Sequence, residues 1–341
     1  MSICISRTNN SMRPTLDPLN SRYRLGADLG RGSFGEVYHC QDSVSGQHYA
    51  AKLEPVKAPL PQLTMESKVL GSLQSLHGVP KLIWAGAEQG YSVLVMELLG
   101  PNLETLLQLC GGKFSLKTTL LVGEQILDRL EDLHHSSYVH RDLKPENFAI
   151  GQGQASQLVY LLDFGLAKKY KDQGSHIPYR DHRGLTGTLR YASVNAHLGL
   201  ELSRRDDLES LCYLLIYLAK GGLPWQGVVA AKQERSDRVL EMKLSSGFDA
   251  LCRGLPSEFA AALRYVRSLH FEADPNYAYL HRLFRDCLSP QSATPTYDWS
   301  NLPLEHLQLT ASPSSASQST DSGPGPAFRA GLRNKILSTS C

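Results

Sequence analysis

Short runs of alternating apolar and polar residues, separated by glycine-containing turns, characterise the chain from residue 23 to residue 100. Glu36–Cys40 and Gln47–Lys52 show this alternation, and Tyr91–Met96 is typical of a further strand. Successive side chains of a strand point to opposite faces, so the pattern indicates β-structure. Apolar residues between these runs recur at helical spacing, at Met65, Val69, Leu73 and Leu76. We therefore predict a small sheet with one helix over residues 22–99.

After Gly100 and Pro101 the pattern changes to that of helices. Apolar residues at 120, 126, 127, 130 and 133 predict a long helix over Leu116–His134. Leu208–Ala219 is apolar nearly all round, as expected for a helix at the centre of a lobe. We also predict a short buried strand over 158–162 and helices over 258–269 and 277–288. The chain therefore predicts an α+β fold of two lobes, a small β-rich one (22–99) and a larger, mainly helical one (100–295), with a hinge at Gly100-Pro101.

The two ends of the chain lack these patterns. Residues 1–21 are polar and contain two prolines, and residues 311–326 contain six Ser, three Pro and two Gly. Segments of this composition cannot bury enough apolar surface to offset the entropy lost on ordering. We predict disorder over 1–21 and a disordered Ser/Pro-rich tail over 296–341.

Composition narrows the class of protein. The chain of 341 residues is 42% hydrophobic and 20% charged, as in a globular protein, and its net charge of +2 indicates no partner by itself. Seven scattered cysteines without a Cys-x-x-Cys pair argue against disulfides or zinc and favour a reducing compartment. No signal peptide is evident, and the longest apolar run, Ser210–Ala219, is too short for a membrane span. We expect a cytoplasmic monomer without membrane insertion, and we leave a nuclear location open.

One short segment carries the most specific chemistry. Residues 140–147 read His-Arg-Asp-Leu-Lys-Pro-Glu-Asn, and an Asp-Phe-Gly triplet begins 21 residues after Asp142. Phosphoryl transfer from ATP to a hydroxyl needs a base, a cation for the γ-phosphate and oxygen ligands for Mg²⁺. Asp142 would receive the hydroxyl proton, and Lys144 would neutralise charge on the phosphate. Asn147 and Asp163 would bind Mg²⁺, because hard cations take oxygen ligands.

A glycine-rich segment predicts the nucleotide site. Residues 30–37 read Gly-Arg-Gly-Ser-Phe-Gly-Glu-Val between two predicted strands, so their backbone N–H groups can approach phosphates closely. Lys52 follows on the next strand and would hold the α- and β-phosphates. It needs a carboxylate to position it. Glu66 on the predicted helix is our candidate, while Glu54 is the rival and lies too near Lys52 along the strand.

Together these motifs resemble those of the eukaryotic protein kinases over residues 22–290, and within them the casein kinase I family. The signatures are Leu-Thr-Gly-Thr-Leu-Arg-Tyr-Ala-Ser at 185–193, Ser-Val-Asn at 193–195, Ser-Arg-Arg-Asp-Asp-Leu-Glu-Ser-Leu at 203–211 and Leu-Pro-Trp-Gln-Gly at 223–227. Asn-Phe-Ala at 147–149 is closer to the tau-tubulin kinases. The resemblance implies a bilobal protein kinase fold, with Met96 as gatekeeper and Glu97 and Leu99 as hinge residues. It implies an ATP site made of Leu29, Gly30, Arg31, Gly32, Ser33, Phe34, Gly35, Glu36, Val37, Ala50, Lys52, Met96, Glu97 and Leu99.

The resemblance also implies a Ser/Thr protein kinase that uses ATP and Mg²⁺ and needs no phosphorylation of its activation segment. Basic residues suggest a preference for acidic or phospho-primed protein substrates, because guanidinium groups suit phosphate and carboxylate. We expect one anion site formed by Arg141, Lys168 and Arg183, and a second formed by Arg190, Lys232 and Arg235. A solvated basic face is the alternative for each residue. The charge is compact and has few aromatic neighbours, which argues against a nucleic-acid partner.

Two further alternatives stay open at this point. A kinase-fold scaffold without catalysis is the competing function, although every expected catalytic position is filled. The serine-rich tail would either inhibit the enzyme after phosphorylating itself, as the resemblance implies, or be an inert linker.

Overall fold

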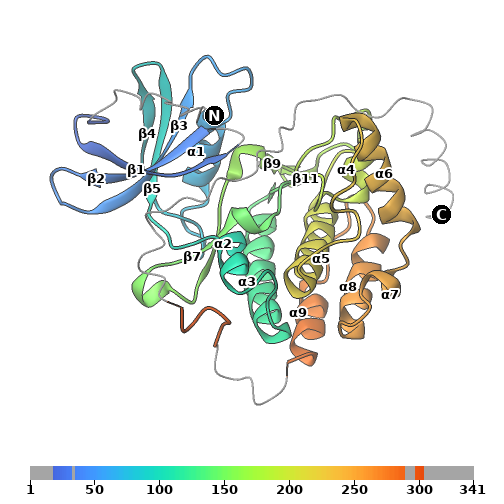
Figure 1. The fold of residues 1–341 in the computed structure, drawn as a ribbon. Coiled ribbons are helices and arrows are strands. Elements are labelled where there is room, and N and C mark those ends of the chain that lie inside the picture. Colours follow the sequence, from blue (N-terminus) through green and yellow to red (C-terminus); the bar gives the residue numbers. More distant parts are fainter. Residues whose placement is uncertain (1–17, 33–34, 289–295, 303–341) are drawn as a thin grey trace, which may run out of the picture.

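The computed structural model describes residues 18–32, 35–288 and 296–302, and it has two lobes (Figure 1). The smaller lobe is an antiparallel sheet in the order β1-β2-β3-β5-β4, covered by helix α1 (Leu63–Ser72). Its strands are β1 (Tyr23–Gly32), β2 (Gly35–Asp42), β3 (His48–Pro55), β4 (Leu82–Glu88) and β5 (Tyr91–Glu97). This arrangement confirms the predicted α+β fold with a β-rich N-terminal lobe.

The register of β3 decides which side chains face α1. Ala51 and Leu53 pack in a cluster with Val93 and Val95 of the neighbouring β5. Side chains alternate along a strand, so Lys52 points to the opposite face, toward α1. The same alternation that predicts the strand therefore directs Lys52 toward the helix that carries its expected partner.

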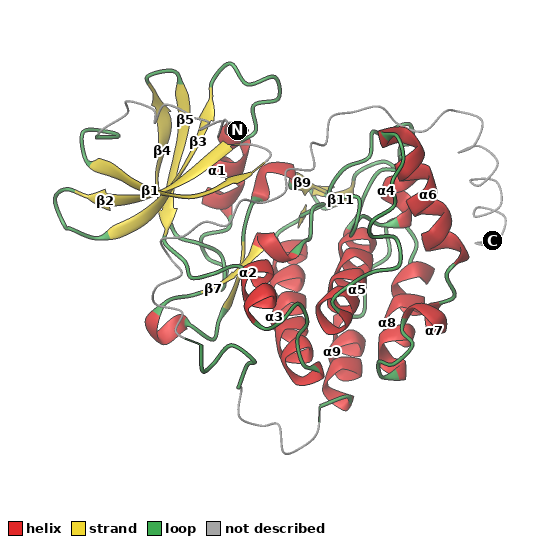
Figure 2. Cartoon of the chain, viewed as in Figure 1, coloured by secondary structure: helices red, strands yellow, loops and turns green. Residues whose placement is uncertain are grey.

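The larger lobe is mainly helical (Figure 2). Its helices are α2 (Leu103–Leu109), α3 (Leu116–His135), α4 (Val194–His197), α5 (Arg204–Lys220), α6 (Lys232–Ser245), α7 (Phe248–Leu251), α8 (Ser257–Ser268) and α9 (Tyr277–Asp286). Three short two-stranded ribbons precede α4, namely β6 (Tyr138–Val139) with β9 (Lys168–Lys169), β7 (Phe148–Ile150) with β8 (Val159–Leu161), and β10 (Lys171–Asp172) with β11 (Ser175–His176). Single 3-10 turns occur at η1 (Pro145–Asn147), η2 (Gly153–Ala155) and η3 (Phe164–Leu166).

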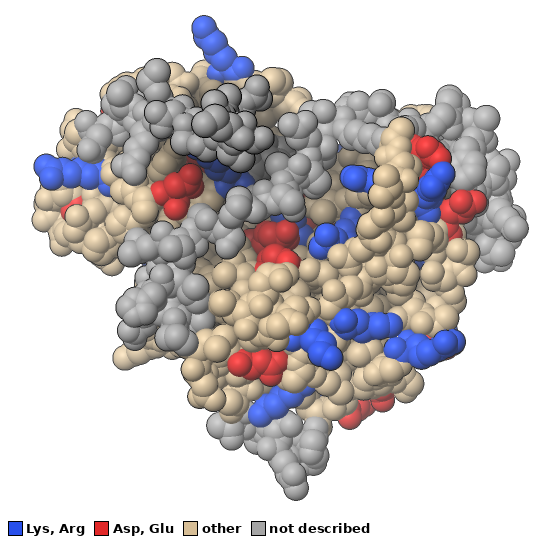
Figure 3. Space-filling model, in the orientation of Figure 1, with Lys and Arg blue, Asp and Glu red and all other residues tan. Residues whose placement is uncertain are grey.

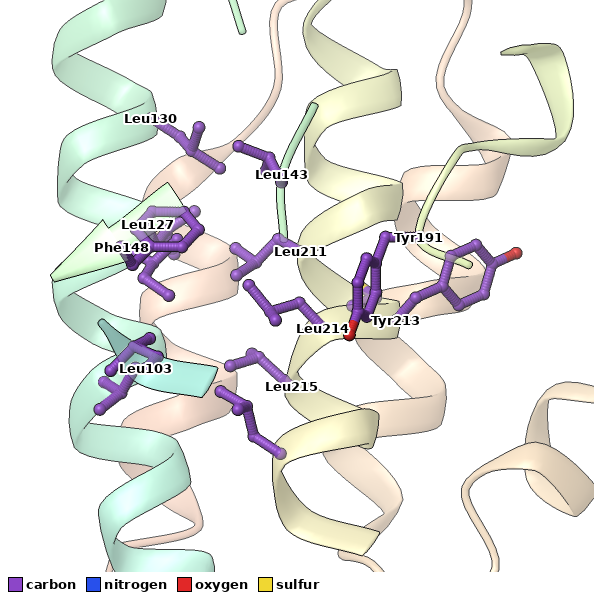
Figure 4. Packing of buried hydrophobic residues seen from close by; sticks show 14 of the residues in the cluster. Leu103, Leu127, Leu130, Leu143, Phe148, Tyr191, Leu211, Tyr213, Leu214 and Leu215 are labelled. Carbon is purple, nitrogen blue, oxygen red and sulfur yellow. The ribbon is translucent and has the colours of Figure 1, made fainter. Parts of the chain in front are cut away.

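The core of this lobe lies between α3 and α5. Leu127 and Leu130 of α3 face Leu211 and Leu214 of α5, as Figure 4 shows. Gly123 permits the close approach, since a Cβ there would lie 3.1 Å from the Leu215 side chain. The helices predicted over 116–134 and 208–219 are thus confirmed as the central pair.

Two predicted boundaries are wrong. The segment 296–302, assigned to the disordered tail, packs on the larger lobe: Tyr297 and Trp299 are buried and stacked at 4.7 Å, and Asp298 accepts hydrogen bonds from Ser115 at the start of α3. At the other end, Leu19 is fully buried, although it falls in the predicted disordered segment 1–21. Two aromatic rings and one leucine supply the apolar area that offsets their ordering. Residues 1–17 and 303–341 lie outside the described residues.

Two further observations concern the apolar residues expected on α1 and the length of the helices. Met65, expected on the buried face of α1, is 56% exposed, and Leu76 lies beyond the end of this helix. Among the described residues, no helix is long and apolar enough to cross a membrane.

Candidate active site

Lys52 is buried between two carboxylates. Its Nζ atom lies 2.7 Å from Oε2 of Glu66 on α1 and 3.1 Å from Oδ1 of Asp163. The expected pairing of Lys52 with Glu66 is therefore present. The rival Glu54 instead accepts the backbone N–H groups of Gln62 and Leu63, at the start of α1. Glu54 thus fixes the N-terminal end of α1, the helix that carries Glu66.

Lys52 stabilises both carboxylates of this group, while burial and the charge of Asp163 raise the pKa of Glu66. Burial would lower the pKa of Lys52, but Asp163 and Glu66 outweigh it and raise this pKa well above its usual value. Burial would likewise raise the pKa of Asp163, but Lys52 and Lys144 hold it at about 2. Lys52 is therefore a cation, and Asp163 an anion, throughout the neutral range.

The loop that carries Asp142 is held by α5. Asp207, in the first turn of this helix, accepts hydrogen bonds from the backbone N–H groups of His140 and Arg141, at 2.7 and 2.8 Å, and contacts Nε2 of His134 at 3.0 Å. Three such contacts satisfy a buried carboxylate. Asp207 therefore has a structural role, since it holds the backbone of the loop that carries Asp142. His140 is also structural, since it is fully buried and its ring packs on Phe164.

Asp142 itself is held by two neighbours. Its Oδ2 atom accepts a hydrogen bond from Lys144 Nζ at 2.8 Å, and its Oδ1 atom accepts two from Thr188, through the backbone N–H and the hydroxyl, at 2.7 Å each. The predicted base and phosphate-binding cation therefore lie side by side. The aspartate is also fixed in one orientation, as a base that must meet a substrate hydroxyl requires.

Thr188 is a site residue that the sequence analysis did not identify. The preceding Gly187 has φ +89°, and a Cβ there would lie 2.4 Å from the carbonyl oxygen of Arg141. Only glycine therefore lets the chain pass this close to the catalytic loop. The Thr-Gly-Thr sequence at 186–188 is the signal that could have identified it.

Asn147 and Asp163 are brought together by the pairing of two short strands. Phe148 pairs with Leu161, and the backbone N–H of Leu162 donates to the carbonyl of Asn147 at 2.9 Å. Asn147 Nδ2 donates to the carbonyl of Asp142, which leaves the amide oxygen available for a metal. Asp163 adopts φ +62°, a strained conformation for a non-glycine residue. One amide oxygen and one carboxylate at a single edge fit a hard divalent cation such as Mg²⁺.

The described part of the glycine-rich segment lies at the facing ends of β1 and β2. Gly30 pairs with Val37, Arg31 with Glu36 and Gly32 with Gly35. A Cβ at Gly35 would lie 2.4 Å from the carbonyl of Leu53, so this strand also passes closely over β3. Of the expected ATP-binding residues, Ser33 and Phe34 lie outside the described residues.

The expected adenine-binding residues lie on adjacent strands. Leu29 is on β1 and Val37 on β2, while Ala50 on β3 pairs with Met96, the expected gatekeeper, on β5. The hinge residues Glu97 and Leu99 follow, and Leu99 accepts a hydrogen bond from Gln152 through its carbonyl oxygen. The expected adenine-binding residues therefore lie on four strands of one sheet, with Leu99 just beyond the end of β5.

The first predicted anion site contains a carboxylate from the protein itself. Lys168 and Arg183 both bind the buried Glu201, at 2.6 and 2.8 Å, and Arg141 donates instead to the carbonyl of Leu166. Burial would raise the pKa of Glu201, but Lys168 and Arg183 lower it, so this residue is an anion. The three basic residues converge as expected. They form a closed cluster around Glu201 rather than an open site, because an internal carboxylate neutralises two of them.

The second predicted anion site stays a prediction, because no described contact joins Arg190 to Arg235. The guanidinium of Arg190 lies over the rings of Tyr191 and Tyr217, and Glu104, which accepts from Tyr217, adds a negative charge nearby. Arg235 lies in the first turn of α6 and shares no described partner with Arg190. The side chain of Lys232 is not described. On the described part of the face in Figure 3, basic and acidic side chains are interspersed.

These features are those of a two-lobed phosphotransferase: a buried lysine–glutamate pair, oxygen donors that fit a divalent cation, and an aspartate hydrogen-bonded to a lysine on a short loop. The chain belongs to the protein kinases, since residues 23–260 match the family model described as the protein kinase domain.

Proposed function

We propose that this protein is a Ser/Thr protein kinase of casein kinase I type, which transfers the γ-phosphate of Mg-ATP to Ser or Thr hydroxyls of acidic or phospho-primed proteins. The observation that carries the proposal is the joint geometry of Lys52–Glu66–Asp163 and Asp142–Lys144. Every group required for phosphoryl transfer is present, and each is held by a named partner.

The reaction follows from these positions. The hydroxyl oxygen of the acceptor residue attacks the γ-phosphorus, the bond to the bridging oxygen breaks, and ADP leaves. Asp142 receives the hydroxyl proton, and Lys144 balances charge on the transferred phosphoryl group. Lys52 holds the α- and β-phosphates. Asn147 and Asp163 would hold Mg²⁺, which neutralises phosphate charge when bound.

Substrate preference is the finer part of the proposal. Among the described basic residues of the predicted sites, Arg141, Arg190 and Arg235 have no carboxylate ion pair, and they support a preference for negative charge near the acceptor. The Glu201 cluster supports activity without phosphorylation of the activation segment. A buried carboxylate already occupies the position among Lys168 and Arg183 where a phosphate would otherwise bind.

Transfer of labelled phosphate from Mg-ATP tests this function. The acceptors would be casein, a serine peptide, the same peptide with phosphoserine three residues before the acceptor, and its tyrosine counterpart. We expect transfer to serine, faster with priming, and a loss of about 10²–10⁴-fold in Asp142→Asn. Asp249→Asn, an exposed aspartate on α7, is the matched control and should be unchanged.

Each outcome decides a different part of the proposal. Activity without a priming preference would keep the kinase and remove the acidic-substrate assignment. Transfer to tyrosine alone would remove the Ser/Thr assignment. No transfer by folded, ATP-binding protein would favour a scaffold instead.

A further inference from the structure

The segment Thr188–Ala192 is held from two opposite sides. On one side, Thr188 contacts Asp142 as described above. On the other, the carbonyl of Arg190 accepts a hydrogen bond from Trp225 Nε1 at 2.8 Å. The carbonyls of Leu189 and Ala192 also accept hydrogen bonds, and both come from a single lysine of α6.

This lysine, Lys243, is 3% exposed, and its Nζ atom has three hydrogen-bonding partners. Its Nζ atom lies 3.0 Å from the carbonyl oxygen of Leu189, 2.6 Å from that of Ala192 and 3.1 Å from Nε2 of His197 on α4. Three acceptors match the three N–H groups of an ammonium ion. The rings of Tyr213 and Trp225 lie 5.0 and 5.1 Å from the nitrogen and favour a cation by their π-faces.

Keeping a lysine here has a cost in free energy. Burial lowers the pKa of Lys243 to about 7, although Glu209 of α5 raises it, and Arg267 of α8 lowers it further. A surface lysine would avoid this cost. The three partners satisfy the hydrogen-bonding capacity of this lysine only because the Leu189–Ala192 backbone adopts this one conformation.

We propose that Lys243 is a positioning residue for the peptide substrate, holding the Leu189–Ala192 backbone so that an acceptor hydroxyl meets Asp142. This inference rests on the proposed kinase function. The segment it holds begins at Thr188, which touches the catalytic base, so residues 189–192 flank the place where the acceptor must lie. A displacement of about 1 Å there is enough to reduce transfer strongly. Lys243 touches neither ATP nor the acceptor and acts through the backbone.

Lys243→Met and Lys243→Gln test this role. Methionine has nearly the same length and no donor, whereas glutamine keeps two N–H groups on a shorter side chain. The matched control is Lys220→Met, because Lys220 of α5 also donates to two carbonyls, those of Leu251 and Arg253, away from the segment. The readouts are the KM for the serine peptide, the KM for ATP, and hydrogen exchange of the Tyr191 and Ala192 amides, which bond the carbonyl of Thr188.

We expect Lys243→Met to raise the peptide KM about tenfold, with Lys243→Gln intermediate, the ATP KM within about twofold of wild type and Lys220→Met unchanged. Exchange of the two amides should accelerate about tenfold or more, while α3 and α5 keep their protection. Wild-type peptide KM and wild-type exchange in a folded variant would overturn the inference. Hydrogen exchange that accelerates evenly over the whole larger lobe would also overturn the inference, because that result indicates a merely structural role.

The test still gives an answer if Lys243→Met does not fold or if the wild-type protein is inactive. If Lys243→Met does not fold, exchange and KM in Lys243→Gln decide. If the wild-type protein transfers no phosphate, the proposed function fails, while the exchange of Tyr191 and Ala192 still shows whether Lys243 holds the segment.

Discussion

Lys52 and Lys243 are both buried lysines, yet their surroundings shift their pKa values in opposite directions. Lys52 contacts two carboxylates, and its pKa is raised. Lys243 contacts two carbonyls and one imidazole, and burial lowers its pKa to about 7. Neutral acceptors satisfy the donors of a lysine but do not offset the desolvation of its charge.

The comparison separates two uses of one side chain. Lys52 supplies a fixed positive charge to a site that must hold phosphates, so its carboxylate partners keep it protonated at any neutral pH. Lys243 supplies three directed N–H groups to a backbone segment, so its geometry matters more than its charge. Lys52 thus serves the reaction through its charge, whereas Lys243 serves it by positioning the backbone.

Replacing Lys52 with methionine should have the largest effect. The variant loses the cation that aligns the α- and β-phosphates, and we expect kcat to fall on the order of 10³-fold. Steady-state transfer to casein measures the loss, and binding of a fluorescent ATP analogue shows that the nucleotide site is still formed. Lys57→Met, an exposed lysine of the same lobe, is the matched control. Retention of more than a tenth of wild-type activity would contradict the assigned role.

The sequence predicts the Lys52 site well because its parts follow local rules. Strand alternation gives the face of Lys52, helical spacing places Glu66 opposite, and the Asp-Phe-Gly triplet supplies Asp163. Lys243 follows no such rule. It is one polar residue on an amphipathic helix, where a solvent-exposed side chain is expected. Its partners are two carbonyls and one imidazole, 46–54 residues away along the chain.

The same physical reason explains the other differences. Charge counting finds Lys168 and Arg183 but not Glu201, because a single glutamate 18–33 residues further on carries no signal that it will fold between them. Composition likewise assigns residues 296–302 to the tail, although Tyr297 accepts a hydrogen bond from Gln125 of α3 and Trp299 packs on Phe114. Tertiary contacts of this kind depend on the completed fold.

Removing the carboxylate near Lys243 should have an intermediate effect. Glu209 lies 3.5 Å from Arg267 and accepts hydrogen bonds from Val194 N and the Tyr213 hydroxyl. Glu209→Gln keeps an acceptor oxygen but leaves Arg267 and Lys243 without a compensating charge. We expect the free energy of unfolding to fall by about 2 kcal/mol, and the melting temperature by several degrees.

A surface pair provides the control for this variant. Glu234→Gln removes the partner of Arg238 on the exposed face of α6, where both side chains are more than half exposed. Such a pair contributes about 0.5 kcal/mol or less, because water and salt screen it. Equal melting shifts in the two variants would show that burial does not amplify the Glu209 interaction.

A third basic residue, His281, is also buried beside carboxylates, and replacing it should have the smallest effect. On α9 it lies 3.1 Å from Glu124 and 3.3 Å from Asp128 of α3, with Glu131 at 3.7 Å. The hydrogen bond to Glu124 raises its pKa against the effect of burial, and the neighbouring Arg285 opposes the rise. Because the folded-state pKa lies above the usual 6.5, the contribution is fully present below pH 6.5 and is lost as the pH rises through the raised value.

Melting temperatures of the wild type and His281→Gln between pH 5.5 and 8.5 would measure this contribution. We expect the wild type to be more stable than His281→Gln at pH 5.5, by on the order of 0.5 kcal/mol. This difference should shrink toward alkaline pH. A constant difference over this range would show that His281 acts by packing alone. A difference that grows with pH would reverse the sign and contradict the rule drawn from Lys52, that carboxylate partners keep a buried base protonated.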